Sequence, residues 1–268
     1  MTITKNAYAK INLTLEILGT KRADGFHDIA SIMHKAKSLY DTVTVTLTDS
    51  GISLECDKNV CAPTDNLAYK AAQKYIDKYT EKTGKTLGVD IKIQKNIPAG
   101  AGLAGGSSDA ATVLDCLQEL KSALSENEID EIALSLGSDV PFCLEKHTCA
   151  LCTGRGEEIR DLPALENIEV VFYLPKTPLS TKGIYGEYDK LYGDDYTKNK
   201  SFFMAEAIEK NADISDILSY MCNDFQRLCE ARCPEIKDGC KILANQGYFS
   251  QMSGSGSAVF GINKFNVK

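Results

Sequence analysis

Apolar and polar residues alternate along residues 7–17, which is the pattern of a strand with one buried face. Lys10 and Asn12 belong to the polar set. We therefore predict a half-buried strand in this segment. The β-branched run over 42–48 and the alternation over 89–93 predict two further strands, so we expect the N-terminal region to be rich in β-structure.

Apolar residues recur at helical spacing in several other stretches. Residues 66–79 show this spacing, and Gly84 follows as a stop signal. Residues 126–136 show it again and end at Gly137. A third helix is predicted from Ser107 onward, with Ser107 or Ser108 as its N-cap and Asp109 in its first turn, where a carboxylate suits the helix dipole.

The second half of the chain mixes both periodicities. We predict an alternating apolar segment over 142–151, a strand over 168–174, short helices between 201 and 246, and a last strand after the Gly/Ser run at 253–257. A boundary between two lobes is expected within 154–163. The predicted domains are therefore residues 1–155 and 156–268, and the fold class is α+β.

Composition narrows the class of protein. Hydrophobic residues make up 43% of the chain and charged residues 25%, as in ordinary globular proteins. The net charge is −7, whereas nucleic-acid-binding proteins are typically basic, so we expect no nucleic-acid partner. The sequence shows neither a signal peptide nor a long apolar stretch, which favours a cytoplasmic protein without membrane contact and with reduced cysteines.

The glycine-rich run between the strand at 89–93 and the helix from Ser107 is the strongest chemical signal. Four of the seven residues 100–106 are glycine, and consecutive glycines let backbone amides approach an anion ahead of a helix N-terminus. We interpret this run as a phosphate cradle, the alternative being a flexible surface turn. The run satisfies G-x-G-x-x-G by letter, but another helix follows where a dinucleotide-binding fold needs a strand.

The glycine-rich run lacks the lysine of a Walker A loop, so a cation must come from elsewhere. Lys10 is the candidate, because a lysine in a half-buried strand is costly without an anionic partner; the alternative is an exposed strand lysine.

Asp139, directly after a helix stop, is either a carboxylate that reaches into a cleft or a turn residue. The Gly/Ser run at 253–257 is either a second anion-binding loop or a tight connection, and His27 either contacts a ligand base or caps a turn.

Taken in order, these motifs resemble the GHMP kinase family. The resemblance spans nearly the whole chain and rests on Ala9–Leu13, Arg22–His27, Asp65–Leu67, Ile97–Ala111, Gly137–Pro141, Gly154–Gly156 and Ser253–Gly256. It implies a GHMP kinase two-lobe fold, with an N-terminal lobe like domain 2 of ribosomal protein S5 and an α+β C-terminal lobe. It also implies ATP with Mg²⁺ as cofactor, and a protein that is a monomer or a weak homodimer.

The resemblance further implies a reaction and a set of site residues. The reaction is phosphorylation of the 2-hydroxyl of cytidine diphosphate methylerythritol, in the non-mevalonate route to isoprenoid precursors, with Asp139 as general base and Lys10 as charge stabiliser. Asn12, Phe26, His27 and Tyr185 would bind this substrate, and Ser107 or Ser108 would contact Mg²⁺. The residues expected to bind ATP are Asn66, Lys95, Pro98, Ala99, Gly100, Ala101, Gly102, Leu103, Ala104, Gly105, Gly106, Ser107 and Ser108.

Two departures from the family pattern bear on these expectations. Phe26 stands where the family often has Tyr, which keeps a stacking ring and removes a hydroxyl. Relatives usually continue past the Gly/Ser run with another helix and strand, so the C-terminal domain is expected to be shorter by those elements. Two other functions stay open: phosphorylation of another small alcohol, and nucleotide binding without catalysis.

Overall fold

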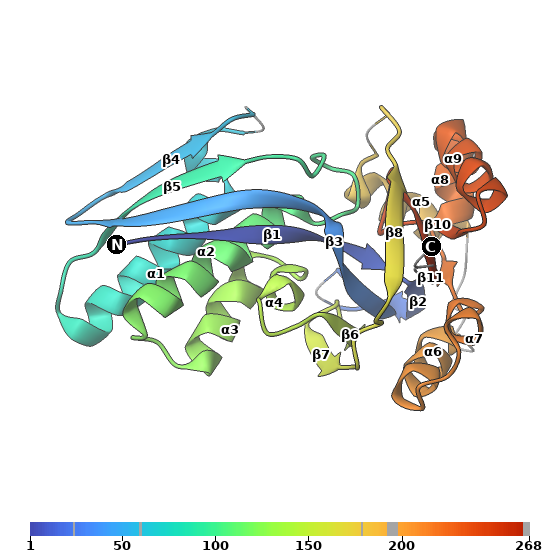
Figure 1. Cartoon of the computed structure of the whole chain (residues 1–268), viewed down its shortest axis with the longest axis horizontal. Helices are drawn as coiled ribbons and strands as arrows, with labels where there is room; N and C mark the ends of the chain where they lie inside the picture. The colour runs from blue at the N-terminus through green and yellow to red at the C-terminus, as the bar shows by residue number, and fades with distance from the viewer. Residues whose placement is uncertain (24, 59–60, 178, 192–197, 265–268) are drawn as a thin grey trace. The chain divides into compact units, whose positions relative to one another are not determined.

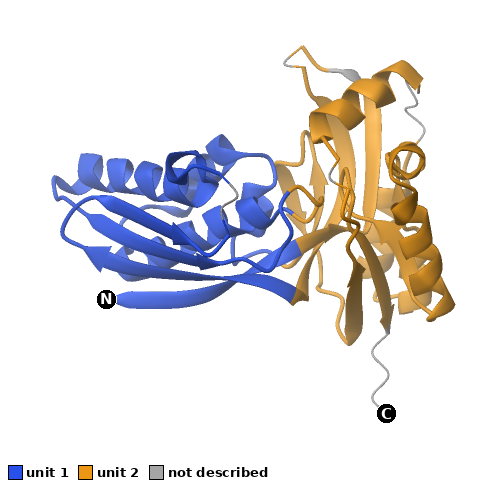
Figure 2. Cartoon of the chain, turned by 90° about the horizontal axis from the view of Figure 1, so that it is seen from above, with its two compact units in different colours: residues 1–9, 39–99, 104–147 blue, residues 10–38, 100–103, 148–268 orange. Residues whose placement is uncertain are grey.

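The computed structural model describes residues 1–23, 25–58, 61–177, 179–191 and 198–264. Contacts divide the chain into two compact units, coloured separately in Figure 2. Unit 1 consists of residues 1–9, 39–99 and 104–147, and unit 2 of residues 10–38, 100–103 and 148–268. The predicted sequence domains, 1–155 and 156–268, stay predictions.

Unit 1 is a sheet with helices on one face. Its elements are the first part of β1 (Thr2–Asn12), the second half of β3 (His27–Thr48), β4 (Ile52–Cys56), the 3-10 helix η1 (Pro63–Asp65), α1 (Leu67–Thr83), β5 (Gly88–Gln94), α2 (Gly105–Lys121), α3 (Glu126–Leu136) and α4 (Val140–Cys143). β5 pairs antiparallel with β3 and parallel with β4, so that Ile91 lies opposite Val45 and Leu54. Helices α1, α2 and α3 run along one face of these strands (Figure 1), where Tyr75 and Leu114 are fully buried.

The predicted helices over 66–79 and 126–136 are confirmed, and local capping explains their ends. The Asn66 side chain accepts the backbone N–H of Ala68 at 2.9 Å, and Gly84 ends α1 in the left-handed conformation with φ of +68°. Ser125 and Glu128 form a capping box at the start of α3. These signals lie within a few residues of each helix end, which is why the sequence reveals them.

The predicted N-cap of α2 is wrong. The helix begins at Gly105, two residues earlier than expected, and follows Ala104, which has φ of +56° and no capping side chain. The Ser108 hydroxyl instead donates to the carbonyl oxygen of Tyr8 at 2.7 Å and is buried. Helix propensity disfavours the glycines of this turn, but packing of unit 1 outweighs it.

Unit 2 contains the remaining elements: β2 (Thr14–Lys21), β6 (Cys149–Thr153), β7 (Glu158–Asp161), β8 (Ile168–Tyr173), α5 (Thr181–Leu191), α6 (Lys200–Glu209), α7 (Ile214–Leu218), β9 (Cys222–Asn223), α8 (Gln226–Arg232), α9 (Pro234–Asn245), β10 (Phe249–Met252) and β11 (Val259–Lys264). β10, β11 and β8 form a three-stranded antiparallel sheet in that order, and α9 packs on it. β2 pairs antiparallel with the first half of β3 and parallel with β9. The segment 142–151, predicted as one alternating run, is divided between α4 and β6.

The segment 7–17 departs from the prediction in two ways. It is two strands, β1 and β2, separated at Leu13, and its polar side chains are buried as well as its apolar ones. Glu16, on the polar side, accepts the backbone N–H and the hydroxyl of Ser201 and is 3% exposed. Alternation misled the prediction because polar groups can be buried once they hydrogen-bond to one another.

Candidate functional site

The two glycine-rich loops meet inside unit 2, backbone against backbone. Ser253 Oγ donates to the carbonyl oxygen of Gly102 at 3.0 Å, and the Ala258 N–H donates to that of Ala101 at 3.1 Å. Gly102 has φ of +79°, and a Cβ on it would lie 2.2 Å from the Ser253 carbonyl oxygen. Only glycine fits there, so residues 100–103 and 253–258 form one joined loop pair.

Lys10 extends this loop pair with a buried cation. Its backbone N–H donates to the carbonyl oxygen of Leu103 at 3.1 Å, and its Nζ donates to Asn12 Oδ1 at 2.7 Å. Asn12 in turn donates to Ser31 Oγ at 2.9 Å, and a Cβ on Gly254 would lie 3.5 Å from Asn12 Oδ1. Lys10 is 4% exposed, so the alternative of an exposed strand lysine is wrong. A buried ammonium beside glycine-rich backbone suits an anion such as phosphate.

Lys95, predicted to bind ATP, lies in unit 1 in a buried group of charges that we call the Asp41–Lys95–Asp109 triad. Its Nζ donates to Asp109 Oδ2 at 2.6 Å and also to Asp41. The other oxygen of Asp41 accepts the Ile97 N–H at 2.8 Å. A Cβ on Gly105, the first residue of α2, would lie 3.4 Å from Nζ. The triad therefore connects β3, the segment after β5 and the start of α2.

The triad shifts the pKa values of Asp109 and Lys95. Burial raises the pKa of the Asp109 carboxyl to about 7, with Lys95 opposing the rise and Asp41 adding to it. Burial disfavours the Lys95 ammonium, but the charge and hydrogen bonds of Asp109 and Asp41 outweigh it and raise the pKa of Lys95. Asp109 Oδ1 has no hydrogen-bond partner among the described residues, so this buried carboxyl is only partly satisfied by Lys95.

Asp139 lies in unit 1 in the turn between α3 and α4, and its side chain is half-buried. It occupies the N-cap position of α4, yet within the described part of the chain its carboxylate makes no capping hydrogen bond. Capping therefore does not account for this residue. Asn66, predicted near the nucleotide, has its side-chain oxygen engaged as the N-cap of α1.

The aromatic residues predicted to bind the substrate gather in unit 2. The Phe26 ring is 50% exposed and lies under the Arg155 guanidinium, 5.0 Å from carbon to ring centroid. The rings of His27 and Tyr185 stack at 5.7 Å with an interplanar angle of 23°. Tyr185 also meets Phe225 edge-on at 4.6 Å. Asp24 of the same sequence motif lies outside the described residues.

Comparison with known proteins agrees with these motifs. The family model of the GHMP kinase N-terminal domain matches residues 66–147. A curated 4-diphosphocytidyl-2-C-methyl-D-erythritol kinase from Clostridium novyi is 39% identical over 263 residues, which cover 95% of this chain and 89% of that protein. The chain belongs to the GHMP kinase family. Within it, the chain falls in the branch of that relative, and the predicted α+β fold class is confirmed.

Other relatives of this GHMP kinase agree. The curated kinase of the same name from Desulfotalea psychrophila is 39% identical and matches over 97% of this chain and 85% of its own length. A crystal structure of a 4-(cytidine 5'-diphospho)-2C-methyl-D-erythritol kinase has a TM-score of 0.79 and 31% identity, covering 98% of this chain and 90% of that one. A homoserine kinase from Cytophaga hutchinsonii has a TM-score of 0.72 at 15% identity and 98% and 85% coverage, which shows a shared fold.

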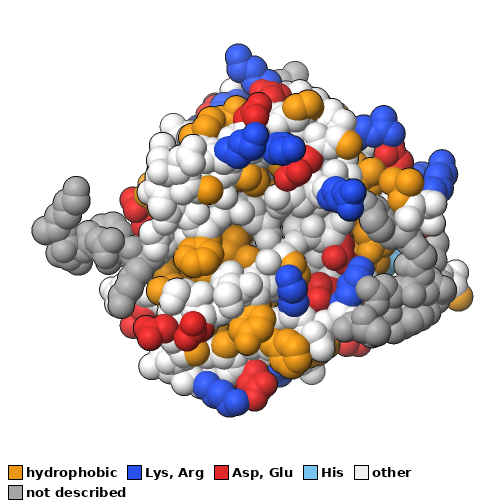
Figure 3. Space-filling view, turned by 90° about the vertical axis from the view of Figure 1, so that its right-hand side faces the viewer, with side chains coloured by type: hydrophobic (Ala, Val, Ile, Leu, Met, Phe, Trp, Pro, Cys, Tyr) orange, Lys and Arg blue, Asp and Glu red, His pale blue; other side chains and the backbone are white. Residues whose placement is uncertain are grey.

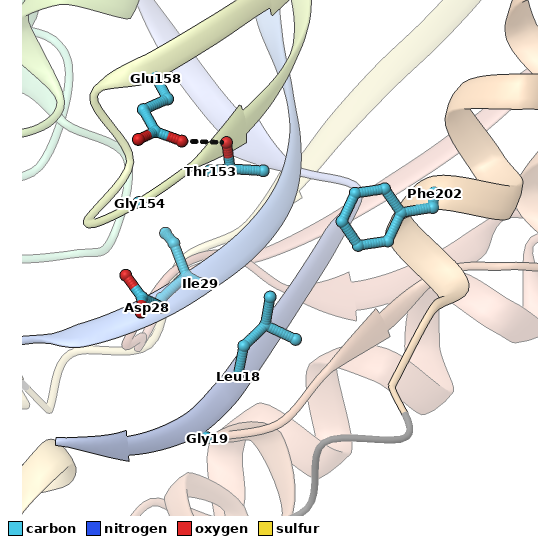
Figure 4. A pocket seen from close by; sticks show the side chains of 8 residues that line it. All are labelled: Leu18, Gly19, Asp28, Ile29, Thr153, Gly154, Glu158 and Phe202. Atoms are coloured by element: carbon cyan, nitrogen blue, oxygen red, sulfur yellow. Dashed lines mark hydrogen bonds between the residues drawn. The ribbon is translucent and has the colours of Figure 1, made fainter. Parts of the chain in front are cut away.

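A surface cavity of about 490 Å³ lies in unit 2 of this GHMP kinase (Figure 4), and no sequence motif predicted it. Its lining residues are Leu18, Gly19, Asp28, Ile29, Thr153, Gly154, Glu158 and Phe202. Thr153 Oγ1 donates to Glu158 Oε2 at 2.8 Å on one wall, and Leu18 and Phe202 supply apolar surface. No local pattern marks it, because β2, β3, the β6–β7 hairpin and α6 meet there only in the folded chain.

One face of this GHMP kinase carries mixed charge. On the face shown in Figure 3, Lys and Arg side chains alternate with Asp and Glu, and hydrophobic side chains are scattered among them. Among the described residues, no helix is long and apolar enough to cross a bilayer.

Proposed function

We propose that this GHMP kinase transfers the γ-phosphoryl group of ATP to the 2-hydroxyl of 4-diphosphocytidyl-2-C-methyl-D-erythritol. The observation that carries the proposal is the loop pair with buried Lys10, a ready site for a phosphate, in a chain whose curated relatives bear that kinase's name. Phosphoryl transfer needs positioning and charge stabilisation more than covalent chemistry, and such a site supplies both.

Each predicted residue has a role in this reaction. The acceptor hydroxyl oxygen forms the new bond to the γ-phosphorus, the bond from that phosphorus to the β,γ-bridging oxygen breaks, and ADP leaves. Asp139 receives the hydroxyl proton, and Lys10 stabilises the negative charge on the transferring group. The loop of residues 98–108 holds the ATP phosphates through the backbone N–H groups of the residues that follow Pro98, with Asn66 and Lys95 close to the nucleotide.

Mg²⁺ would accompany the ATP phosphates and neutralise part of their charge. Of the two serines predicted to contact it, Ser107 fits better. The Ser108 hydroxyl is buried and already donates to a backbone carbonyl, whereas Ser107 is half-buried at the start of α2.

The aromatic group in unit 2 supports a cytidine substrate over a smaller alcohol. Phe26 presents an exposed ring face, and His27 and Tyr185 stack beside each other, whereas homoserine and mevalonate have no aromatic ring to be stacked. The Arg155 guanidinium lies over the Phe26 ring and also pairs with Glu157 at 3.2 Å. Asn12 would contact the methylerythritol part of the substrate.

The test is ADP release with Mg·ATP and 4-diphosphocytidyl-2-C-methyl-D-erythritol, run beside mevalonate, homoserine and no acceptor. We expect turnover with the cytidine substrate alone. Equal turnover with another alcohol would replace the substrate assignment. A folded protein that binds ATP and turns over none of them would show nucleotide binding without catalysis.

Two variants test the roles. Asp139→Asn should keep ATP affinity within a few fold and lose turnover, whereas the control Asp130→Asn, an exposed acid of unit 1 paired with Lys146, should keep both. Lys10→Ala should lower the rate of the chemical step in single-turnover experiments. Full turnover of Asp139→Asn would remove that residue from the base role.

A further inference from the structure

Ser31 lies on β3, two hydrogen bonds away from the Lys10 ammonium. Its side chain is fully buried. The Ser31 hydroxyl donates to the carbonyl oxygen of Thr14 at 2.6 Å, and the side-chain nitrogen of Asn12 donates to Ser31 Oγ at 2.9 Å. The side-chain oxygen of Asn12 accepts from Lys10 Nζ at 2.7 Å. Three buried side chains therefore form one continuous hydrogen-bonded chain that ends on the Lys10 ammonium.

The donors and acceptors along this chain can be assigned in only one way. A carbonyl oxygen only accepts, so the single hydroxyl proton of Ser31 is committed to Thr14. The Ser31 oxygen then acts as an acceptor, which places the NH₂ group of Asn12 on the Ser31 side. The amide oxygen of Asn12 is left to face Lys10, whose ammonium only donates. Ser31 thereby makes the orientation of the Asn12 amide unique.

The backbone around Ser31 holds its hydroxyl in place. Within β3, Ser31 is paired with Cys152 of β6. The next residue, Ile32, donates its N–H to Thr14 Oγ1 at 2.8 Å and accepts the N–H of Leu13 at 2.7 Å through its carbonyl oxygen. The residue that receives the Ser31 proton is thus itself fixed to β3. Precise placement of a functional side chain requires this kind of rigid support.

The other end of the chain lies at the glycine-rich loop pair. The Lys10 backbone N–H donates to the carbonyl oxygen of Leu103, and a Cβ on Gly254 would lie 3.5 Å from Asn12 Oδ1. We propose that Ser31 is a positioning residue that holds Asn12 and, through Asn12, holds the Lys10 ammonium in place for phosphoryl transfer. The inference deepens the proposed function and rests on it for the role of Lys10.

The variant Ser31→Ala removes the anchor and leaves Asn12 and Lys10 in the chain. Its single-turnover rate with saturating Mg·ATP and acceptor should fall about fivefold to tenfold, the factor that corresponds to one lost hydrogen bond in a buried network. The KM for ATP should stay within about twofold of the wild-type value, because no group that binds ATP has been removed. Ser31→Thr keeps the hydroxyl and should restore the rate to within about threefold of the wild type.

A matched control lies on the same strand. The Ser38 hydroxyl also donates to a backbone carbonyl oxygen, that of Val170 at 2.7 Å, so Ser38→Ala should keep the wild-type rate. A double variant tests the route from Ser31 to Lys10. Once Asn12→Ala has removed the amide, adding Ser31→Ala should cause no further loss of rate. A further loss as large as that in the wild-type background would overturn the inference.

Chemical labelling gives a readout that needs no turnover. Acetic anhydride acetylates lysine amines faster when they are more accessible, and mass spectrometry follows each lysine separately. Lys35, which is 8% exposed and lies on the same strand as Ser31, is the internal reference. In Ser31→Ala the acetylation rate of Lys10 relative to Lys35 should rise about fivefold. A general loosening of the fold would speed both lysines alike, which would overturn the inference.

The outcomes separate the two proposals. A wild type that phosphorylates the cytidine substrate, together with Ser31→Ala at the wild-type rate, would overturn the inference and leave the proposed function standing. A wild type that turns over no acceptor, together with faster labelling of Lys10 alone in Ser31→Ala, would overturn the proposed function and support the inference. If Ser31→Ala does not fold, Ser31→Cys replaces it, because a thiol keeps the shape and accepts hydrogen bonds only weakly; a wild-type rate in that variant again overturns the inference.

Discussion

Replacing Asp109 by Asn should change how the stability of this kinase depends on pH. The Asp109 carboxyl shares the Lys95 ammonium with Asp41, and the triad has two acids for one base, all buried. Asp41 also accepts backbone N–H groups, and Asp109 accepts a hydrogen bond from Lys95. Burial raises the pKa of Asp109 to about 7. Asn keeps the shape of the side chain and removes the titration.

The magnitude follows from linkage between proton binding and folding. An unfolded chain releases this proton near the ordinary pKa of 3.8, and the folded chain releases it near 7, so the folded state holds the extra proton between these values. The contribution of Asp109 to the free energy of unfolding is therefore largest in acid and falls as pH rises through this window, by about 1.4 kcal/mol per pH unit. From pH 5 to pH 8 the wild type should lose roughly 2–3 kcal/mol relative to Asp109→Asn, with little change above pH 7.

Urea unfolding followed by circular dichroism at pH 5, 6, 7 and 8 measures this difference for the two proteins side by side. Titrating groups outside the triad are common to both proteins, so their contributions cancel in the difference. Glu131→Gln, an exposed acid on α3, is the control for losing one negative charge. A difference between Asp109→Asn and wild type that stays constant across the range would refute the reasoning.

Two further predictions concern packing. Gly102→Ala should lower the thermal midpoint and weaken ATP binding, because a Cβ there would lie 2.2 Å from a backbone oxygen. Gly100→Ala is the control: its Cβ, at φ of +67°, would meet open space, so the substitution should cost only about 1 kcal/mol of backbone strain. Equal effects of the two substitutions would contradict the close contact within the loop pair. Glu16→Gln should lower the free energy of unfolding by about 2 kcal/mol, because the new side-chain NH₂ group would face the N–H and hydroxyl donors of Ser201 at the start of α6. A variant as stable as the wild type would show that the buried carboxylate is unimportant.

Local signals explain what the sequence predicted well. Asn66, Gly84, Ser125 and Gly137 mark helix ends through contacts with residues a few positions away, and the structure confirms those helices. The glycine-rich run also showed where backbone must approach closely, because no other residue type tolerates the position of Gly102. Family motifs then supplied the fold class, which the relatives confirm.

Long-range pairing explains what the sequence did not reveal. Asp41 is fully buried against Lys95, which is 54 positions later, and nothing near Asp41 in the sequence announces that partner. The contact of His27 with Asp189 spans a still longer separation. The buried polar side of the first two strands was hidden for the same reason, since Glu16 finds its donors on α6. The roles of Lys10 and of the other predicted site residues stay predictions until the variants are measured.

The two units are completed at different times as the chain leaves the ribosome. The chain changes unit after residues 9, 38, 99, 103 and 147, so all of unit 1 has been synthesised once residue 147 has emerged. β2 is made among the first strands, yet its parallel partner β9 lies at Cys222–Asn223. During synthesis one side of β2 therefore waits for about 200 further residues, exposed to chaperones and to neighbouring nascent chains, while unit 1 already has the sequence it needs to fold.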